Sequence, residues 1–191
     1  MKTIFGGLVA LTLSTTAALA GNWTLDNDAS RLAFGSIKSN FIGEVHHFGK
    51  LSGSVDEAGN AKVAIDLSSV ETNIDIRNSR MIEHVFKAAG SADLTSTLDL
   101  TTIEALPVGG TTVVETEATL DLIGTEVEMD VSLFVARLAE DKVLVTSNDF
   151  LFLDTDEAGI DPAIDILKEL ASLESITRVA PVSLRFVFTK E

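Results

Sequence analysis

The alternation of apolar and polar residues between positions 126 and 135 is the feature that most narrows the choice of fold. Apolar residues occupy every second position from 127 to 135, and they are interleaved with Glu126, Glu128, Asp130 and Ser132. Because successive side chains of a β-strand point to opposite faces, this run predicts a strand with one dry and one solvated face.

The same period of two recurs along the chain and predicts an all-β protein. It is clear from Ala61 to Leu67 and looser from Arg31 to Ser36. It also occurs in residues 94–100, 114–122, 143–146 and 182–188. Turn-forming residues separate these runs at 57–60, 107–110, 124–125 and 140–142. We count about eight strands, and the short links between them favour antiparallel pairing.

A sheet of roughly eight antiparallel strands can close into a barrel that hides its edges and encloses one ligand. A two-sheet sandwich would produce much the same alternation. The alternation alone therefore leaves barrel and sandwich equally open.

Two short helices interrupt the predicted strands. The first is expected from Asp75 to about Ala89, because Ile82, Val85, Phe86 and Ala89 form one apolar stripe. The second is expected from Asp161-Pro162 to about Leu173, since an acidic cap followed by proline is typical of a helix start. Both helices should lie against the barrel or cap one of its ends.

The N-terminal residues have the pattern of an export signal. Lys2 precedes an apolar run from Ile4 to Leu13, and Ala18-Leu19-Ala20 supplies the small residues of a cleavage site. The run is shorter than the roughly 20 residues that a membrane span needs. We therefore expect a cleaved signal peptide over residues 1–20, a single domain over residues 21–191, and a soluble protein in a bacterial periplasm.

Composition excludes several kinds of chemistry and partner. The chain has no cysteine, so it can form neither a disulfide nor a thiolate site. Its formal net charge of −15 repels phosphate backbones and anionic membrane surfaces. We expect no nucleic-acid partner and no stable membrane insertion.

The segment from Leu67 to Phe86 carries the most distinctive motif of the chain, which consists of Ser69-Val70-Glu71-Thr72, then Arg77-Asn78, then Phe86. Its flanking features are Trp23-Thr24-Leu25-Asp26, Phe48 five residues before Gly53, Leu122-Ile123-Gly124 and the run Val179 to Leu184. In order and spacing, these features resemble the YceI-like, polyisoprenoid-binding family. The resemblance implies a lipocalin-like antiparallel barrel that holds a long isoprenoid, either a quinone or a polyprenyl phosphate. It also implies a possible homodimer.

If the barrel holds such a lipid, the inward faces of the predicted strands and of the first helix should line its lumen. The expected lining residues are Leu32, Phe34, Ile65, Leu67, Met81, Val85, Phe86, Val131, Leu133, Leu184 and Phe186. Arg77 and Arg80 lie on the polar side of the first helix, where they would form ion pairs with neighbouring acids or contact a charged head group.

Metal and catalytic chemistry have weaker support in the sequence. His46 and His47 are adjacent, so on a strand they point to opposite faces and cannot easily share an ion; we expect ordinary histidines at the barrel rim. The acidic run from Asp154 to Gly159 resembles a calcium loop, but Ala158 replaces a needed ligand. No hydrolase, zinc-protease or nucleotide-binding motif is present. We expect no metal, no cofactor other than the bound lipid, and no enzyme activity.

Two other interpretations remain at this point. The first is a ligand-free stress or interaction protein whose barrel core is filled by its own side chains. The second is an enzyme that acts on a bound lipid or quinone.

Overall fold

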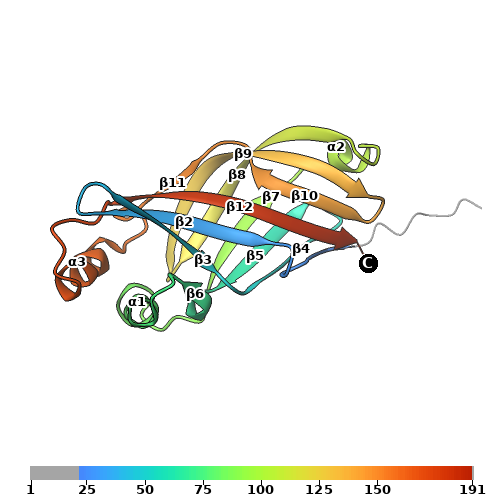
Figure 1. Ribbon diagram of the computed structural model, residues 1–191. Coiled ribbons are helices and arrows are strands. Elements are labelled where there is room, and N and C mark those ends of the chain that lie inside the picture. Colours follow the sequence, from blue (N-terminus) through green and yellow to red (C-terminus); the bar gives the residue numbers. More distant parts are fainter. Residues whose placement is uncertain (1–21, 191) are drawn as a thin grey trace, which may run out of the picture.

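Eight antiparallel strands close into a barrel in the computed structural model, which describes residues 22–190 (Figure 1). Neighbouring strands follow the order β1-β4-β5-β7-β8-β9-β10-β12, and pairing of β12 with β1 closes the circle. The predicted all-β antiparallel barrel is confirmed, and the sandwich alternative is wrong. The expected signal peptide lies outside the described residues.

The strands are β1 (Trp23–Leu25), β2 (Arg31–Lys38), β3 (Ile42–Phe48), β4 (Leu51–Val55), β5 (Asn60–Asp66), β6 (Val70–Glu71), β7 (Ser91–Thr97), β8 (Thr111–Leu122), β9 (Thr125–Ala139), β10 (Lys142–Ser147), β11 (Leu151–Asp154) and β12 (Val179–Lys190). Four of them lie outside the closed ring. β2, β3 and β6 continue the sheet from β12, and β11 pairs with the first residues of β12. These additional strands lengthen the barrel wall at one end.

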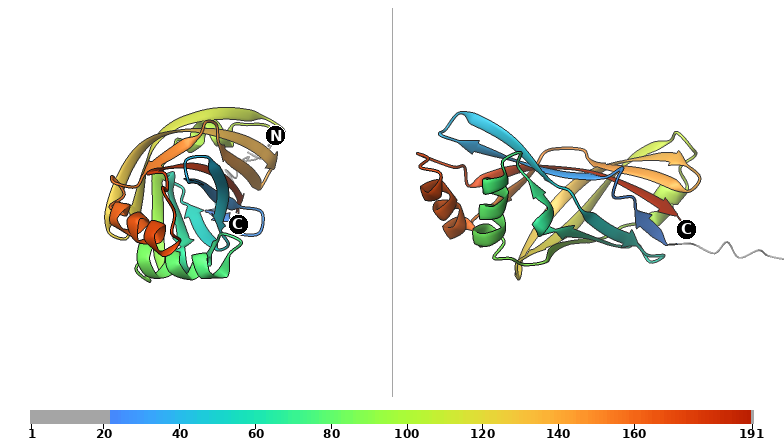
Figure 2. Two further views of the ribbon diagram at one scale, coloured as in Figure 1. Left: turned by 60° about the vertical axis from the view of Figure 1, so that its left-hand side comes forward. Right: turned by 60° about the horizontal axis from the view of Figure 1, so that its bottom comes forward.

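The helices gather at the two ends of the barrel. They are α1 (Asp75–Arg80), a π-helical turn η2 (Met81–Val85), α2 (Leu100–Glu104) and α3 (Asp161–Leu170), with a 3₁₀ turn η1 (Leu67–Ser69) after β5. Figure 1 places α1 and α3 at one end and α2 at the other, and both views of Figure 2 show α1 and α3 side by side. None of the helices in residues 22–190 has the length and apolar character needed to cross a bilayer.

The first predicted helix is shorter and less regular than expected. Its α-helical part ends at Arg80, and the wider turn that follows has the Phe86 N–H donating to the Met81 carbonyl, five residues back, at 2.9 Å. Lys87 and Ala88 then adopt positive φ angles of 50° and 54°, which end the helix before the predicted Ala89. The second predicted helix begins at Asp161 as expected and ends at Leu170, three residues early. Helix α2 was not predicted.

The barrel interior is filled differently at its two ends. Near α2 the buried core includes Trp23, Val135 and Phe188, and the Arg137 guanidinium and the Lys190 ammonium lie 5.6 and 5.4 Å from the Trp23 ring centre. The inward side chains near α1 and α3 instead surround a cavity. The possible binding site therefore occupies only the end of the barrel covered by α1 and α3.

Candidate ligand-binding site

The cavity has a volume of about 410 Å³, within the range typical of small-molecule sites. Strands of the barrel form its walls, and η2 and α3 cover its end. Of its 36 lining residues, only eight are polar or charged. Such a lining favours the hydrocarbon part of a ligand, because burial of apolar surface is the main force available there.

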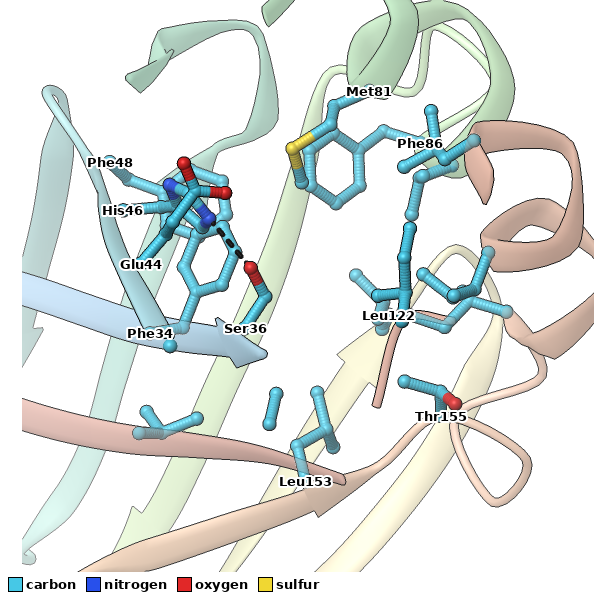
Figure 3. A pocket seen from close by; sticks show the side chains of 18 of the residues that line it. Phe34, Ser36, Glu44, His46, Phe48, Met81, Phe86, Leu122, Leu153 and Thr155 are labelled. Carbon is cyan, nitrogen blue, oxygen red and sulfur yellow. Dashed lines mark hydrogen bonds between the residues drawn. The ribbon is translucent and has the colours of Figure 1, made fainter. Parts of the chain in front are cut away.

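Eight of the eleven residues expected to line the lumen border this cavity, and their contact with a ligand stays a prediction. They are Leu32, Phe34, Ile65, Leu67, Met81, Val85, Phe86 and Leu184. Met81, Val85 and Phe86 come from η2 and the residue after it, where the wide turn directs all three into the interior. Figure 3 shows Met81 and Phe86 reaching down from this turn above the open space.

The other three predicted residues, Val131, Leu133 and Phe186, do not border this cavity. All three side chains are buried, as alternation required, but none of them borders the cavity. Val131 pairs with Thr116, and Leu133 with Val114, whereas the cavity begins further along β8 at Leu120. These three residues belong to the packed end of the barrel.

The sequence did not identify several residues of the cavity wall. From the barrel these include Leu94, Leu120, Leu122 and Met129, and from β11 and α3 they include Leu151, Leu153, Ile164 and Leu167. The barrel residues belong to runs whose alternation had been recognised. What the sequence lacked was a signal for their height along the barrel axis.

An aromatic cluster forms the wall beside β2 and β3. The ring centres of Phe34 and Phe48 are 5.4 Å apart, and those of Phe48 and Phe86 are 5.8 Å apart. The His46 ring joins this cluster at 5.2 Å from Phe34. The histidine is only 2% exposed and is not the rim residue that we expected.

The side chain of His46 makes one hydrogen bond within residues 22–190. Its Nε2 lies 3.0 Å from the Ser36 Oγ, and both side chains line the cavity (Figure 3). The buried Nδ1 has no hydrogen-bond partner among the described residues. Burial lowers the pKa of His46, and the nearby Arg77 charge lowers it further. The ring is therefore neutral at neutral pH.

A serine next to a histidine invites a catalytic interpretation, which the geometry does not favour. In a working nucleophile pair, a third group holds the second ring nitrogen and fixes the tautomer. The free Nδ1 shows that no residue between 22 and 190 provides that group for His46. The pair can still donate or accept a hydrogen bond at the cavity wall.

A small ion network lies at the same side of the cavity. The Glu44 carboxylate on β3 accepts from Arg77 Nη1 at 2.6 Å and from Lys38 Nζ at 3.0 Å. Burial acts to raise the pKa of Glu44, but the hydrogen bonds from Lys38 and Arg77 outweigh it and hold the pKa below its usual 4.5. Arg77 also donates to the Thr72 carbonyl at 2.6 Å, so the network ties α1 to the β3 wall.

The two arginines proposed for a head group both line the cavity, in different settings. Arg77 is half-buried and joined to Glu44, whereas Arg80 donates to the Leu170 carbonyl at the end of α3, 3.2 Å away. This second bond links the two helices that cover the cavity. Whether either arginine contacts a ligand stays a prediction.

The cavity opens to solvent between these helices and the outer strands. Three of its lining residues, Ile74, Ile76 and Phe152, are 43, 59 and 65% exposed and mark the opening. In the part of the chain from 22 to 190, no three His, Cys, Asp or Glu side chains gather in a way that could hold a metal ion. The acidic run from Asp154 forms turns between β11 and α3.

Comparison with known proteins agrees with this architecture. A polyisoprenoid binding domain from Saccharophagus degradans, implicated in plant cell wall breakdown, is 36% identical, with a TM-score of 0.87 over 88% of this chain and 98% of that one. BcnA of Burkholderia cenocepacia shares the fold at 17% identity, with a TM-score of 0.62 over 85% of this chain and 98% of that one.

A Campylobacter jejuni YceI protein also shares the fold, at 15% identity and a TM-score of 0.52 over 76% of this chain and 84% of that one. No curated protein matches the sequence. The model of the YceI-like domain matches residues 23–171. On this match and on the Saccharophagus relative, the chain belongs to the YceI-like family.

Proposed function

We propose that this protein binds a long isoprenoid lipid, an isoprenoid quinone or a polyprenyl phosphate, with the hydrocarbon chain inside the barrel. The observation that carries the proposal is the apolar cavity of about 410 Å³ within a barrel whose other end is packed solid. A filled core would leave no such space, which weighs against a ligand-free interaction protein. The polyisoprenoid-binding relative at 36% identity supports the same class of ligand.

Burial of the hydrocarbon chain would supply the binding free energy. Each methylene removed from water contributes about 0.8 kcal/mol. Ordering the flexible chain and fixing its position oppose this gain, so the net affinity falls well below the simple sum. Chain length and fit should therefore affect affinity strongly.

We propose further that the protein carries or stores the lipid instead of transforming it, and needs no cofactor. The incomplete setting of the Ser36–His46 pair supports this role. The signal-like N-terminal residues support export to the periplasm as a soluble protein, and cell fractionation would test the location. Sedimentation of the purified protein tests the homodimer that the family resemblance implies.

The binding proposal is tested by organic extraction of the purified protein followed by mass spectrometry. We expect a prenyl lipid at close to one molecule per barrel. Leu94→Trp enlarges a side chain of the cavity wall and should lower that content, whereas Leu138→Trp, at an exposed position outside the cavity, should leave it unchanged. A folded wild-type protein that yields no lipid and binds none added to it would refute the proposal.

A further inference from the structure

The Ser36–His46 pair is a largely buried polar position beside the aromatic cluster of the cavity wall. Phe34 and Phe48 flank it, and the cavity lies in front of it (Figure 3). Polar atoms removed from water destabilise a protein unless they are hydrogen-bonded. The free Nδ1 of His46 shows that this position is not fully satisfied by the protein itself.

The hydrogen bond between the two residues leaves one group available to a ligand. A neutral imidazole has one N–H, which sits on either Nε2 or Nδ1. If Ser36 donated to Nε2, the Nδ1 would carry a buried N–H with no acceptor. If instead Nε2 donates to the Ser36 Oγ, the serine O–H is free to donate to a ligand oxygen. The second arrangement leaves no buried N–H without an acceptor, and it presents the Ser36 hydroxyl to the cavity.

The surrounding charges favour an uncharged ligand oxygen at this position. The two cations whose charge acts on His46, Arg77 and Lys38, are both joined to Glu44. A phosphate placed beside Ser36 would lose its hydration and would have to compete with Glu44 for those cations. A carbonyl oxygen needs only the one donor that Ser36 offers.

We infer that Ser36 and His46 form the hydrogen-bonding anchor for a neutral carbonyl oxygen on the ring or end group of the bound isoprenoid, with Phe34 and Phe48 packing against that group. The inference rests on the proposed lipid binding and specifies the class of head group. It assigns selectivity for the head group to two uncharged residues of β2 and β3. Arg77 then has a structural role in the ion network.

The test compares three probes on purified mature protein by titration calorimetry. They are a short prenylated benzoquinone, a hydrocarbon with the same prenyl chain, and the corresponding prenyl phosphate. Ser36→Ala should weaken the quinone about two- to tenfold, the effect of one hydrogen bond, and should leave the hydrocarbon unchanged. Ser183→Ala, on the adjacent strand and outside the cavity lining, is the matched control.

Infrared spectra of the bound quinone give a second readout. In the wild-type protein a carbonyl stretch should move to lower frequency on binding, and in Ser36→Ala this displacement should disappear. Equal weakening of quinone and hydrocarbon, an unshifted carbonyl band, or tighter binding of the phosphate would overturn the anchor while leaving lipid binding intact. Failure of all three probes to bind would overturn the proposed function itself.

Discussion

Replacement of Glu44 by glutamine tests whether the ion network holds α1, at the covered end of the cavity, against β3. The side chains of Glu44, Arg77 and Lys38 are 22, 23 and 26% exposed, so the two ion pairs lie between fully solvated and fully buried cases. Exposed pairs contribute about 0–1 kcal/mol, and breaking a buried pair costs about 3–5 kcal/mol. We expect Glu44→Gln to lower the free energy of unfolding by about 1–2 kcal/mol, which is roughly 2–8 °C in Tm for a domain of this size.

The pH dependence supplies a second check on the same variant. Glu44 has a lower pKa in the folded state than in the unfolded state, so its stabilising contribution is present above pH 4.5 and is lost as pH falls through the folded-state pKa. Thermal unfolding should therefore separate wild type from Glu44→Gln at pH 7, and the difference should shrink in acid. Glu117→Gln is a suitable control, because Glu117 is exposed and has no ion-pair partner within residues 22–190.

The network also predicts an effect on lipid exchange. In Glu44→Gln, α1 loses its charged link to β3, and Arg77 keeps its bond to the Thr72 carbonyl and at most a neutral hydrogen bond to the new amide. A prenyl lipid should then leave Glu44→Gln faster than it leaves the wild-type protein when transfer to acceptor vesicles is followed. Equal Tm at pH 7 together with equal exchange rates would refute the idea that this ion network holds the cover in place.

Three further substitutions test the fold and the site. His46→Gln should make stability less sensitive to pH below about 6.5, because burial keeps the folded-state pKa of His46 low and the unfolded chain takes up the proton first; urea unfolding at pH 7 and 5 measures this. Gly59→Ala should lower the free energy of unfolding by about 2 kcal/mol or more in the same assay, since Gly59 has φ +87° and an added Cβ would clash with the Leu98 carbonyl oxygen. Leu133→Ala should lower the free energy of unfolding by about 2–5 kcal/mol and leave the amount of extracted lipid unchanged, because Leu133 lies in the packed end of the barrel. Loss of lipid from a folded Leu133→Ala variant would show instead that Leu133 contacts the ligand.

The strands and their inward faces could be predicted because both follow from local periodicity. Every apolar residue of the alternation from Val127 to Val135 is at least partly buried, and closure into a barrel matches the expected fold. Five strands, β1, β3, β4, β6 and β11, were not recognised, since they are short or carry residues such as Gly43, Glu44 and His47 that weaken the pattern. Helix α2 escaped notice because its five residues are too few to show a stripe.

The division of the barrel into a packed end and a hollow end could not be predicted from alternation. Alternation with a period of two indicates which face of a strand a residue occupies. The position of that residue along the barrel axis depends instead on how neighbouring strands are staggered. Leu133 and Met129 both point inward on β9, yet only Met129 borders the cavity. The register between β9 and β8 decides which of the two residues borders the cavity. Met129 pairs with Ala118, near the cavity residues Leu120 and Leu122, whereas Leu133 pairs with Val114, which lies further from them.

The same dependence on register explains why the sequence did not single out the Ser36–His46 pair. Arg77 drew attention because a cation is a recognisable phosphate ligand, while His46 looked like one of two unremarkable rim histidines. Pairing of β2 with β3 sets His46 opposite Phe34 and brings its Nε2 to Ser36, ten residues away in sequence. A one-residue slip of that pairing would turn His46 outward and His47 inward. The chemistry of the site therefore follows from strand register as much as from residue type, and the uncharged pair at the wall was visible only after the hairpin was placed.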